Sequence, residues 1–317
     1  MPGDRSRTFP RKNAGTTCQR SIRSSSIAIR PPPHAGKAGS RKETVMIRRY
    51  VFWLVIVSLA CLVLERLFPW RRNQRLLRPQ LGQDIFWLAF NGYFFGLLFK
   101  PALGSINGAI DRAFAFAAGT APADFRVLSG QPVWLQFTIV LVAADFIEWC
   151  VHNLLHRNGW LWKIHRVHHS ILEMDWIGNF RFHWGEIVVY QTFKYLPLAL
   201  LGARWEALLM VAVFSTTIGH LNHSNLNISW GPLRYVLNSP RMHIWHHEKE
   251  HRGPAGVNFA VVFSLWDWLL GTAYMPGEAR VPATIGFRGQ ERVPDGLAMR
   301  FVAPWIDRKA GGLHDPH

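Results

Sequence analysis

The chain has 317 residues, of which 49% are hydrophobic and only 18% are charged, and it contains 15 Trp, 21 Phe and 15 His. This composition excludes an intrinsically disordered protein and a small disulfide-stapled domain. The net charge is +16, but residues 1–49 hold twelve Lys/Arg against two acidic residues, so most of the excess lies in the N-terminal segment. Because no nucleic-acid-binding motif accompanies this charge, we expect no nucleic-acid partner.

Residues 1–45 are rich in Ser, Arg and Pro and show almost no hydrophobic periodicity. Such a segment is typical of a disordered basic tail. Its composition also resembles that of a transit peptide, although it has no amphipathic face. A mis-assigned start is the interpretation we favour, since Met46 is followed by Arg48-Arg49 and then by an apolar segment.

Several charge-poor apolar segments follow, and they predict an all-α integral membrane bundle. The first three are 15 to 18 residues long, and the last two are separated only by Arg204, Trp205 and Glu206, which indicates a helical hairpin. A bilayer core needs about 20 helical residues, so flanking basic side chains would have to reach the interface. We expect about three to five membrane segments. The candidate segments are residues 50–64, 85–99, 127–144, 187–203 and 207–219.

The charges of the connecting loops predict an orientation. Residues 66–83 carry five arginines and no acidic residue, whereas residues 104–131 carry two basic and two acidic residues. The positive-inside rule then places the first loop in the cytoplasm, and the third segment returns the chain to that side. We therefore expect the residues after Ala144 to form a cytoplasmic cap, most simply at a bacterial inner membrane. The basic residues 1–49 would then lie outside, a conflict that translation from Met46 reduces.

Twelve of the fifteen histidines lie between residues 152 and 251, in regularly spaced motifs. Residues three and four apart share one face of a helix, so HxxxH and HxxHH motifs aim their imidazoles at one point. Imidazole nitrogens bind iron, zinc, copper or nickel, and ten of them are too many for one ion and suit two. The candidate ligands are His152 and His156, His165, His168 and His169, His220 and His223, and His243, His246 and His247.

Three further residues are candidates for supporting this metal centre. Asp145 and Glu186 could orient the N–H groups of ligand imidazoles, although a local ion pair or a solvated position is an equal alternative. His183 is expected behind the ligands rather than among them. Because the hairpin returns the chain to the same face, all four histidine motifs can meet at the cytoplasmic membrane boundary.

The motifs resemble those of the fatty acid hydroxylase and sterol desaturase superfamily, integral-membrane enzymes with two irons. The likeness covers roughly residues 130–275 and is closest to the branch that includes alkylglycerol monooxygenase and many bacterial members. Besides the histidines it rests on Asp145, Trp162, Ser170, Arg181-Phe-His183-Trp-Gly-Glu186, His223-Ser-Asn225, the run from Gly231 to Pro240, Asn258, and Trp266-Asp267 with Gly271-Thr272.

This resemblance implies two non-haem iron ions and an oxidoreductase that uses O2 to hydroxylate or desaturate a lipid: a fatty acyl chain, a sterol-like lipid or an ether lipid. No flavin, haem or nicotinamide motif is visible, so electrons must come from a separate donor of the cytochrome b5, ferredoxin or flavoprotein type. Basic residues Arg71, Arg72 and Arg75 could dock an acidic donor. The implied division is a membrane region at 46–129, a histidine domain at 130–275 and a C-terminal tail at 276–317.

Two other functions remain open from the sequence. A membrane metal-binding or metal-transport protein would also carry histidines and acidic residues, although such residues usually lie midway along the apolar segments rather than past their ends. A bis-histidine haem carrier would need only two to four axial histidines. Metal analysis combined with an optical spectrum distinguishes all three.

Overall fold

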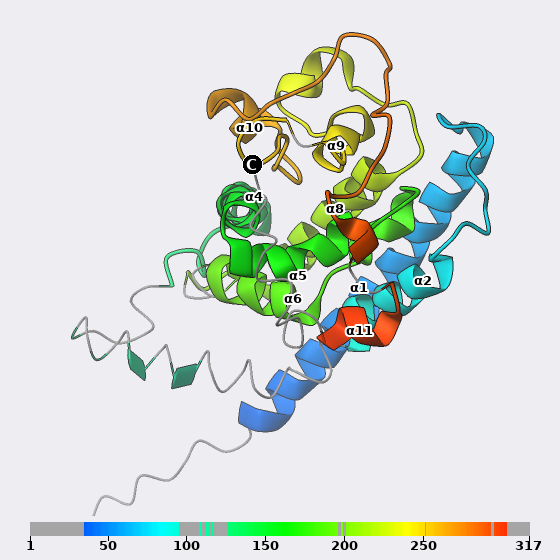
Figure 1. The fold of residues 1–317 in the computed structure, drawn as a ribbon. Coiled ribbons are helices and arrows are strands. Elements are labelled where there is room, and N and C mark those ends of the chain that lie inside the picture. The colour runs from blue at the N-terminus through cyan, green and yellow to red at the C-terminus, as the bar shows by residue number, and fades with distance from the viewer. Residues whose placement is uncertain are drawn as a thin grey trace, which may run out of the picture. The chain divides into compact units, whose positions relative to one another are not determined.

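The computed structural model describes residues 35–94, 126–195, 201–250, 252–292 and 295–302, with a few isolated positions between them. Within these residues every regular element is helical, as the sequence predicts (Figure 1). Residues 1–34, most of the expected basic tail, lie outside the described residues. The α-helices are α1 (Ala35–Leu67), α2 (Leu81–Ala89), α4 (Val133–Arg157), α5 (Gly159–His169), α6 (Trp184–Tyr190), α8 (Trp205–His223), α9 (Pro240–His246), α10 (Leu265–Leu269) and α11 (Leu297–Val302).

Shorter helical turns connect these helices. The π-helical turn η1 (Phe90–Phe94) continues α2, and η4 (Gln191–Tyr195) continues α6. The 3-10 turns are η3 (Trp176–Phe180), η5 (Gly231–Tyr235) and η6 (Gln290–Arg292). The predicted segments 85–99 and 187–203 therefore begin as α2 and α6, and parts of both lie outside the described residues.

Two helices are long and apolar enough to cross a membrane, at Ile47–Leu67 and Val133–Arg157. Helix α1 contains the predicted segment 50–64 but begins at Ala35, so residues 35–45 are helical rather than disordered. Large apolar side chains of α1 point outward, with Phe52 59% and Leu59 55% exposed. In the most apolar 18-residue window of each helix, only 22% and 28% of the residues are buried, whereas the core helices of a soluble protein are mostly buried.

Helix α4 starts later and ends later than the predicted segment 127–144. Pro132 precedes its first turn with an extended backbone, and nothing interrupts the helix before Asn158. Consequently α4 carries the whole HxxxH motif on its last turns. Helix α8 likewise runs past the predicted end at residue 219, because the helix continues through Gly219 and the backbone becomes extended only at Ser224.

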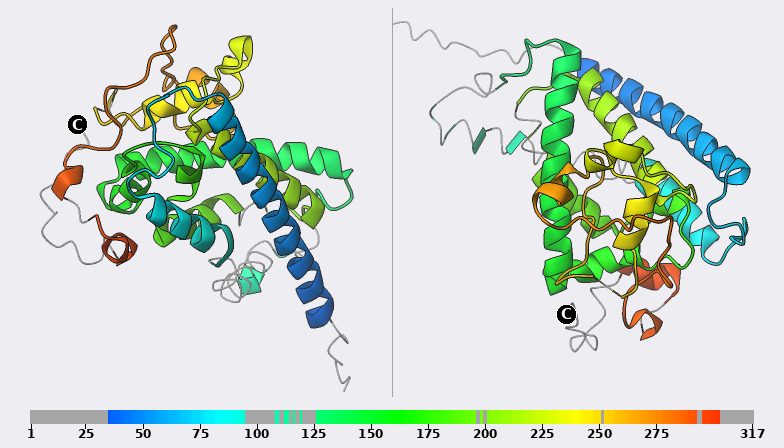
Figure 2. Two further views of the ribbon diagram at one scale, coloured as in Figure 1. Left: turned by 90° about the vertical axis from the view of Figure 1, so that its right-hand side faces the viewer. Right: turned by 90° about the horizontal axis from the view of Figure 1, so that it is seen from above.

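Helix α8 packs against α4, and it also contacts α1 (Figure 2). Val140, Leu141 and Ala144 of α4 form a buried apolar cluster with Val211 and Ile218 of α8. On the other side, the hydroxyl groups of Tyr50 and Thr216 lie 3.0 Å apart, linking α1 to α8. This packing places the C-terminal ends of α4 and α8, which carry histidines, close together.

A buried ion network ties α2 to the segment that follows α5. The Asp84 carboxylate of α2 accepts from Arg181 Nε at 2.5 Å and pairs with Arg78 at 2.7 Å. Arg78 also bonds both carboxylate oxygens of Asp175. Arg78, assigned above to a basic cytoplasmic loop, is therefore an internal residue with two acidic partners.

The described part of residues 276–317 is attached to the histidine region rather than extending away as a tail. Gly286 donates its N–H to the His247 carbonyl at 2.9 Å, and Gln290 donates to the Ser170 carbonyl at 3.0 Å. Further along, the Phe301 carbonyl accepts from His183 and Trp184. These bonds to segments near the histidine motifs hold the described residues around Gly286, Gln290 and Phe301 in place.

Candidate metal centre

Local capping fixes the helices that carry the histidine motifs. The Asn158 side chain accepts from the backbone N–H groups of Trp160 and Leu161, which starts α5 directly after α4 ends. At α9, the Ser239 hydroxyl accepts from the Met242 N–H and Pro240 occupies the first turn. Side-chain oxygens at these positions satisfy N–H groups that a helix start otherwise leaves unpaired. Each motif is thus presented on a helix, as the i, i+3, i+4 spacing predicts.

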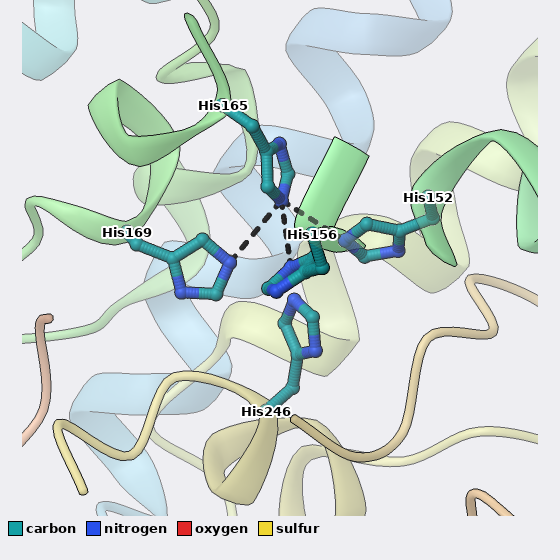
Figure 3. Close-up of side chains that lie close together, drawn as sticks. All are labelled: His152, His156, His165, His169 and His246. Carbon is teal, nitrogen blue, oxygen red and sulfur yellow. Dashed lines mark hydrogen bonds between the residues drawn. The ribbon is translucent and has the colours of Figure 1, made fainter. Parts of the chain in front are cut away.

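The structure gathers nine of the ten candidate histidines into two groups, whose potential ligand atoms lie within 4.8 Å of one another in each group. In the first group the rings point toward a common centre (Figure 3). The Nε2 atoms of His152 and His156 each lie 3.1 Å from that of His165, and the His169 atom lies 3.2 Å from it. The first group consists of His152, His156, His165, His169 and His246.

The second group consists of His168, His223, His243 and His247. Its Nε2 atoms are also close, with His168 3.2 Å from His223, and His243 3.3 Å from His223 and 3.2 Å from His247. The two groups are adjacent, since the rings of His169 and His247 stack with centroids 4.6 Å apart. Two neighbouring sets of imidazoles therefore meet between α4, α5, α8 and α9.

His220, the tenth candidate, is not brought into either group. Its Nε2 atom lies 3.1 Å from the Ser58 hydroxyl of α1, and its Nδ1 atom accepts from the Asn179 amide at 2.9 Å. Both ring nitrogens are therefore engaged in hydrogen bonds. His220 links α8 to α1 and to η3.

The protonation of the rings shows why these groups suit a cation. The Nδ1 atom of His152 lies 2.6 Å from the Phe259 carbonyl, and that of His223 lies 2.9 Å from the Gly219 carbonyl. A carbonyl oxygen only accepts, so each Nδ1 carries the proton and each Nε2 of a neutral ring is a bare lone pair. Several such atoms facing one another repel unless a cation lies between them. Nitrogen ligands about 2.1 Å from a shared ion are about 3.0–3.4 Å apart, and the observed spacings fall in this range.

Burial keeps the imidazoles neutral and available as ligands. All nine are at most 4% exposed. Burial, with smaller contributions from neighbouring imidazoles, lowers the pKa of five of them well below the ordinary value. Neutral imidazole is the form that binds metal ions, so the arrangement fits the coordination of cations. The five are His165, His168, His169, His243 and His247.

Glu186 lies directly behind the first group. Its carboxylate accepts from His165 Nδ1 at 2.8 Å, the position expected for a group that orients a ligand imidazole. Burial, with a smaller effect of nearby Glu148, raises the pKa of Glu186 well above its ordinary value. A cation bound by His165 would lower it again.

Asp145 and His183 make other contacts. The Asp145 carboxylate accepts from the backbone N–H groups of Val262 and Phe263 at 2.8 Å, not from a histidine of either group. The His183 Nδ1 atom accepts from the Gly185 N–H at the start of α6, and its Nε2 atom donates to the Phe301 carbonyl. Asp145 therefore holds the chain after Phe259, and His183 caps a helix.

Residues 137–272 match the family model described as fatty acid hydroxylase. This stretch contains both histidine groups and their supports. Residues 137–272 are similar in sequence to the fatty acid hydroxylase family. The superfamily resemblance drawn from the motifs is thereby confirmed.

Three similar proteins are hydroxylases or monooxygenases by name, and another, from Oryza sativa, is a very-long-chain aldehyde decarbonylase. The ornithine lipid hydroxylase of Rhizobium tropici is 29% identical over 267 residues, covering 81% of this chain and 76% of the relative. Methylsterol monooxygenase 1-1 of Arabidopsis thaliana is 26% identical over 145 residues, covering 43% and 46% of the two chains. Alkylglycerol monooxygenase of Caenorhabditis elegans is 26% identical over 173 residues, covering 52% of this chain and 32% of the relative. No solved structure matches the chain significantly.

Asp267, part of the Trp266-Asp267 motif, has a structural role that the motif by itself does not indicate. The Asp267 carboxylate accepts from the backbone N–H groups of Phe259 and Ala260 at 2.9 Å, and from Trp149 at the same distance. It thereby fixes the Phe259 carbonyl that bonds His152. The sequence does contain a sign of this role: Asp267 is the one acidic residue in the apolar run from residue 254 to 277. A carboxylate buried in such a run needs hydrogen-bond donors around it.

We expect loss of the Glu186 side chain to weaken metal binding rather than to unfold the protein. Removing a residue that orients a metal ligand costs about 10–100-fold in metal affinity. Glu186→Ala should show this loss, whereas Glu186→Gln keeps an oxygen that accepts from His165 and should lose less. Metal titration of the purified variants measures the difference. Equal affinity of wild type and Glu186→Ala would show that the contact has no such role.

Proposed function

We propose that this protein is a membrane-bound diiron oxidoreductase that uses O2 to hydroxylate or desaturate a lipid. The observation that carries the proposal is the pair of adjacent histidine groups inside a stretch similar to the fatty acid hydroxylase family. Nine buried imidazoles with crowded Nε2 atoms suit two ions better than one. All of the candidates except His220 serve as ligands in this proposal.

Iron is the metal that fits both the donor atoms and the relatives. Imidazole sites bind iron, zinc, copper and nickel, but zinc has no redox chemistry. Three of the relatives are named as hydroxylases or monooxygenases, which oxidise their substrates. When bound, a pair of irons supplies the oxidising chemistry that no amino-acid side chain offers.

The chain's own residues hold the site and keep it dry. The Phe259 carbonyl retains the proton on Nδ1 of His152, so that Nε2 points inward as a lone pair. Glu186 does the same for His165. Phe182 stacks on His168 with ring centroids 4.8 Å apart and covers the second group with an apolar surface. Such a setting excludes water, which protects a lipid oxidation from side reactions.

The outward-facing apolar side chains of α1 and α4 support a membrane location. Leu67 and Phe68 at the end of α1 are 64% and 66% exposed, a costly arrangement in water. In this proposal α1 and α4 cross the bilayer, and α2, α6 and α8 lie in it or at its surface. The histidine motifs face the cytoplasm of a bacterial inner membrane, because Arg66, Arg72 and Arg75 are exposed next to the end of α1.

Electrons come from a separate donor in this proposal. Of the three arginines expected to dock it, Arg72 and Arg75 are exposed. Arg71 is partly buried and donates to the Met174 carbonyl and to Gln74. A docked acidic protein would therefore meet Arg72 and Arg75 rather than all three.

The test is to purify the full chain, measure its metals and optical spectrum, and compare the lipids of cells with and without it. We expect about two irons per chain, no haem absorption band, and a hydroxylated or desaturated lipid that depends on the protein. Haem absorption would favour an electron carrier. Bound metal with unchanged lipids would favour the metal-binding or transport alternative.

A further inference from the structure

A cavity of about 1120 Å³ lies outside the two histidine groups, and no step of the proposed oxidation uses it. Its walls come from four separate segments: the loop after α1, the residues after α5, the end of α9, and residues 281–295. Ile244 lines it and lies between His243 and His246 in the chain, and Met174 lines it five residues after His169. The cavity is therefore built on the segments that carry the two HxxHH motifs, at His165–His169 and His243–His247.

The charges around this cavity are balanced in number but not all are paired. Lys249 lies 3.8 Å from Glu291, and Asp295 pairs with Arg300 outside the cavity lining. Among the described residues no side chain pairs with Arg75 or Glu173, which also line it. A site with an unpaired cation and an unpaired carboxylate matches a ligand that carries both charges.

Arg71 also lines the cavity, and it ties two of the segments that form the wall. Its Nε atom donates to Gln74 and its Nη2 atom donates to the Met174 carbonyl. Burial lowers the pKa of Arg71 to about 10, and the nearby carboxylates of Glu65, Asp175 and Glu173 favour its charged form. The guanidinium therefore remains charged at neutral pH and adds positive charge to the wall that carries Arg75.

The loop that forms one wall has the character of a lipid interface. Leu76 and Leu77 are 52% and 81% exposed, and they flank the basic residues of the loop beyond the end of α1. Exposed apolar side chains interspersed with arginines are typical of segments that lie at the head-group level of a membrane. A ligand reaching the cavity from this side is more plausibly a lipid head group than a soluble metabolite.

We propose that this cavity binds the polar head group of the lipid substrate, and that the head group carries both an anionic group and a primary ammonium. The anionic group lies against Arg75, beside the charged Arg71, and the ammonium lies against Glu173. The inference rests on the proposed lipid oxidation, since it names the class of lipid that the enzyme would hold beside its histidine groups. An amino-acid head group and a phosphoethanolamine head group share this chemistry.

Calorimetric titration of the full-length protein in detergent micelles tests the proposal. The probes are dihexanoyl phosphatidylethanolamine and N-hexanoylornithine, which carry both charges, and dihexanoyl phosphatidylglycerol, which carries only the anion. We expect at least one of the first two to bind about tenfold more tightly than the third, the effect of one charged hydrogen bond. The tighter of the two identifies the source of the head group.

Three variants localise the effect. Glu173→Gln should abolish the preference for the ammonium probes, and Arg75→Gln should weaken all three probes about tenfold. Arg72→Gln is the matched control, because Arg72 is an exposed neighbour that does not line the cavity. It should change binding by less than about twofold.

Equal binding of phosphatidylethanolamine, ornithine and phosphatidylglycerol probes would overturn the proposal, as would no binding of any probe. Equal weakening by Arg72→Gln and Arg75→Gln would also overturn it, since it would show general surface attraction. The titration is repeated on metal-depleted protein, so that head-group binding is measured independently of lipid oxidation. Binding without lipid oxidation would thus count against the proposed function and not against the cavity assignment.

Discussion

His168→Ala is expected to lower lipid oxidation by more than about 100-fold and to release metal from the second histidine group. Removing a residue that only orients a metal ligand already lowers metal affinity or activity about 10–100-fold, and removing the ligand itself should cost more. The His168 Nε2 atom lies 3.2 Å from that of His223 and is one of four imidazoles in that group. Three ligands would remain without it. Metal content and lipid turnover of the purified variant measure both effects.

His220→Ala is the matched control, because His220 is equally buried and belongs to a motif of the same kind. Its nitrogens bond Ser58 and Asn179 rather than facing other imidazoles. We expect this variant to keep the metal content of the wild type, although it loses a link between α1 and α8. Full activity of His168→Ala, or equal metal loss in the two variants, would contradict the assignment of the second group.

Asp84→Ala is expected to destabilise the fold by about 3–5 kcal/mol, because it leaves two buried arginines without their shared partner. Asp84 is fully buried and pairs with both Arg78 and Arg181. Arg181 also donates to the Ser170 carbonyl directly after His169, so the loss should reach the segment beside the histidine groups. Denaturant unfolding in detergent micelles measures the change in the free energy of unfolding.

Glu278→Ala provides the comparison for this measurement. Glu278 pairs with Arg280 at 2.6 Å, but both side chains are largely exposed. Exposed ion pairs contribute about 0–1 kcal/mol, so this variant should unfold close to the wild type. If Asp84→Ala unfolds no more easily than Glu278→Ala, the buried network does not stabilise the fold as argued.

Much of the candidate site could be predicted from the spacing of one residue type. Histidines three and four apart share a helical face wherever the chain forms a helix, and α4, α5, α8 and α9 are helical at all four motifs. The apolar runs likewise predicted α1 and α4, although not their ends. Helix ends depend on single capping residues such as Asn158 and Ser239, whose effect on a boundary is difficult to anticipate among many polar residues.

The division of the histidines between the groups could not be predicted in the same way. His168 and His169 are adjacent in sequence, yet they belong to different groups, and so do His246 and His247. Successive residues on a helix point about 100° apart, so neighbours in one motif must face different centres. Which centre each one faces depends on the packing of α5 against α9.

The sequence alone predicted a helical chain with long apolar segments and enough imidazoles for two ions, because periodicity and side-chain type are local properties. The tertiary structure decided which imidazoles meet, that His220 bonds Ser58 and Asn179 instead, and that Asp145 and Asp267 hold the chain behind His152. It also built a charged cavity from four distant segments. These are contacts between residues far apart in sequence, and only the packing of the helices brings them together.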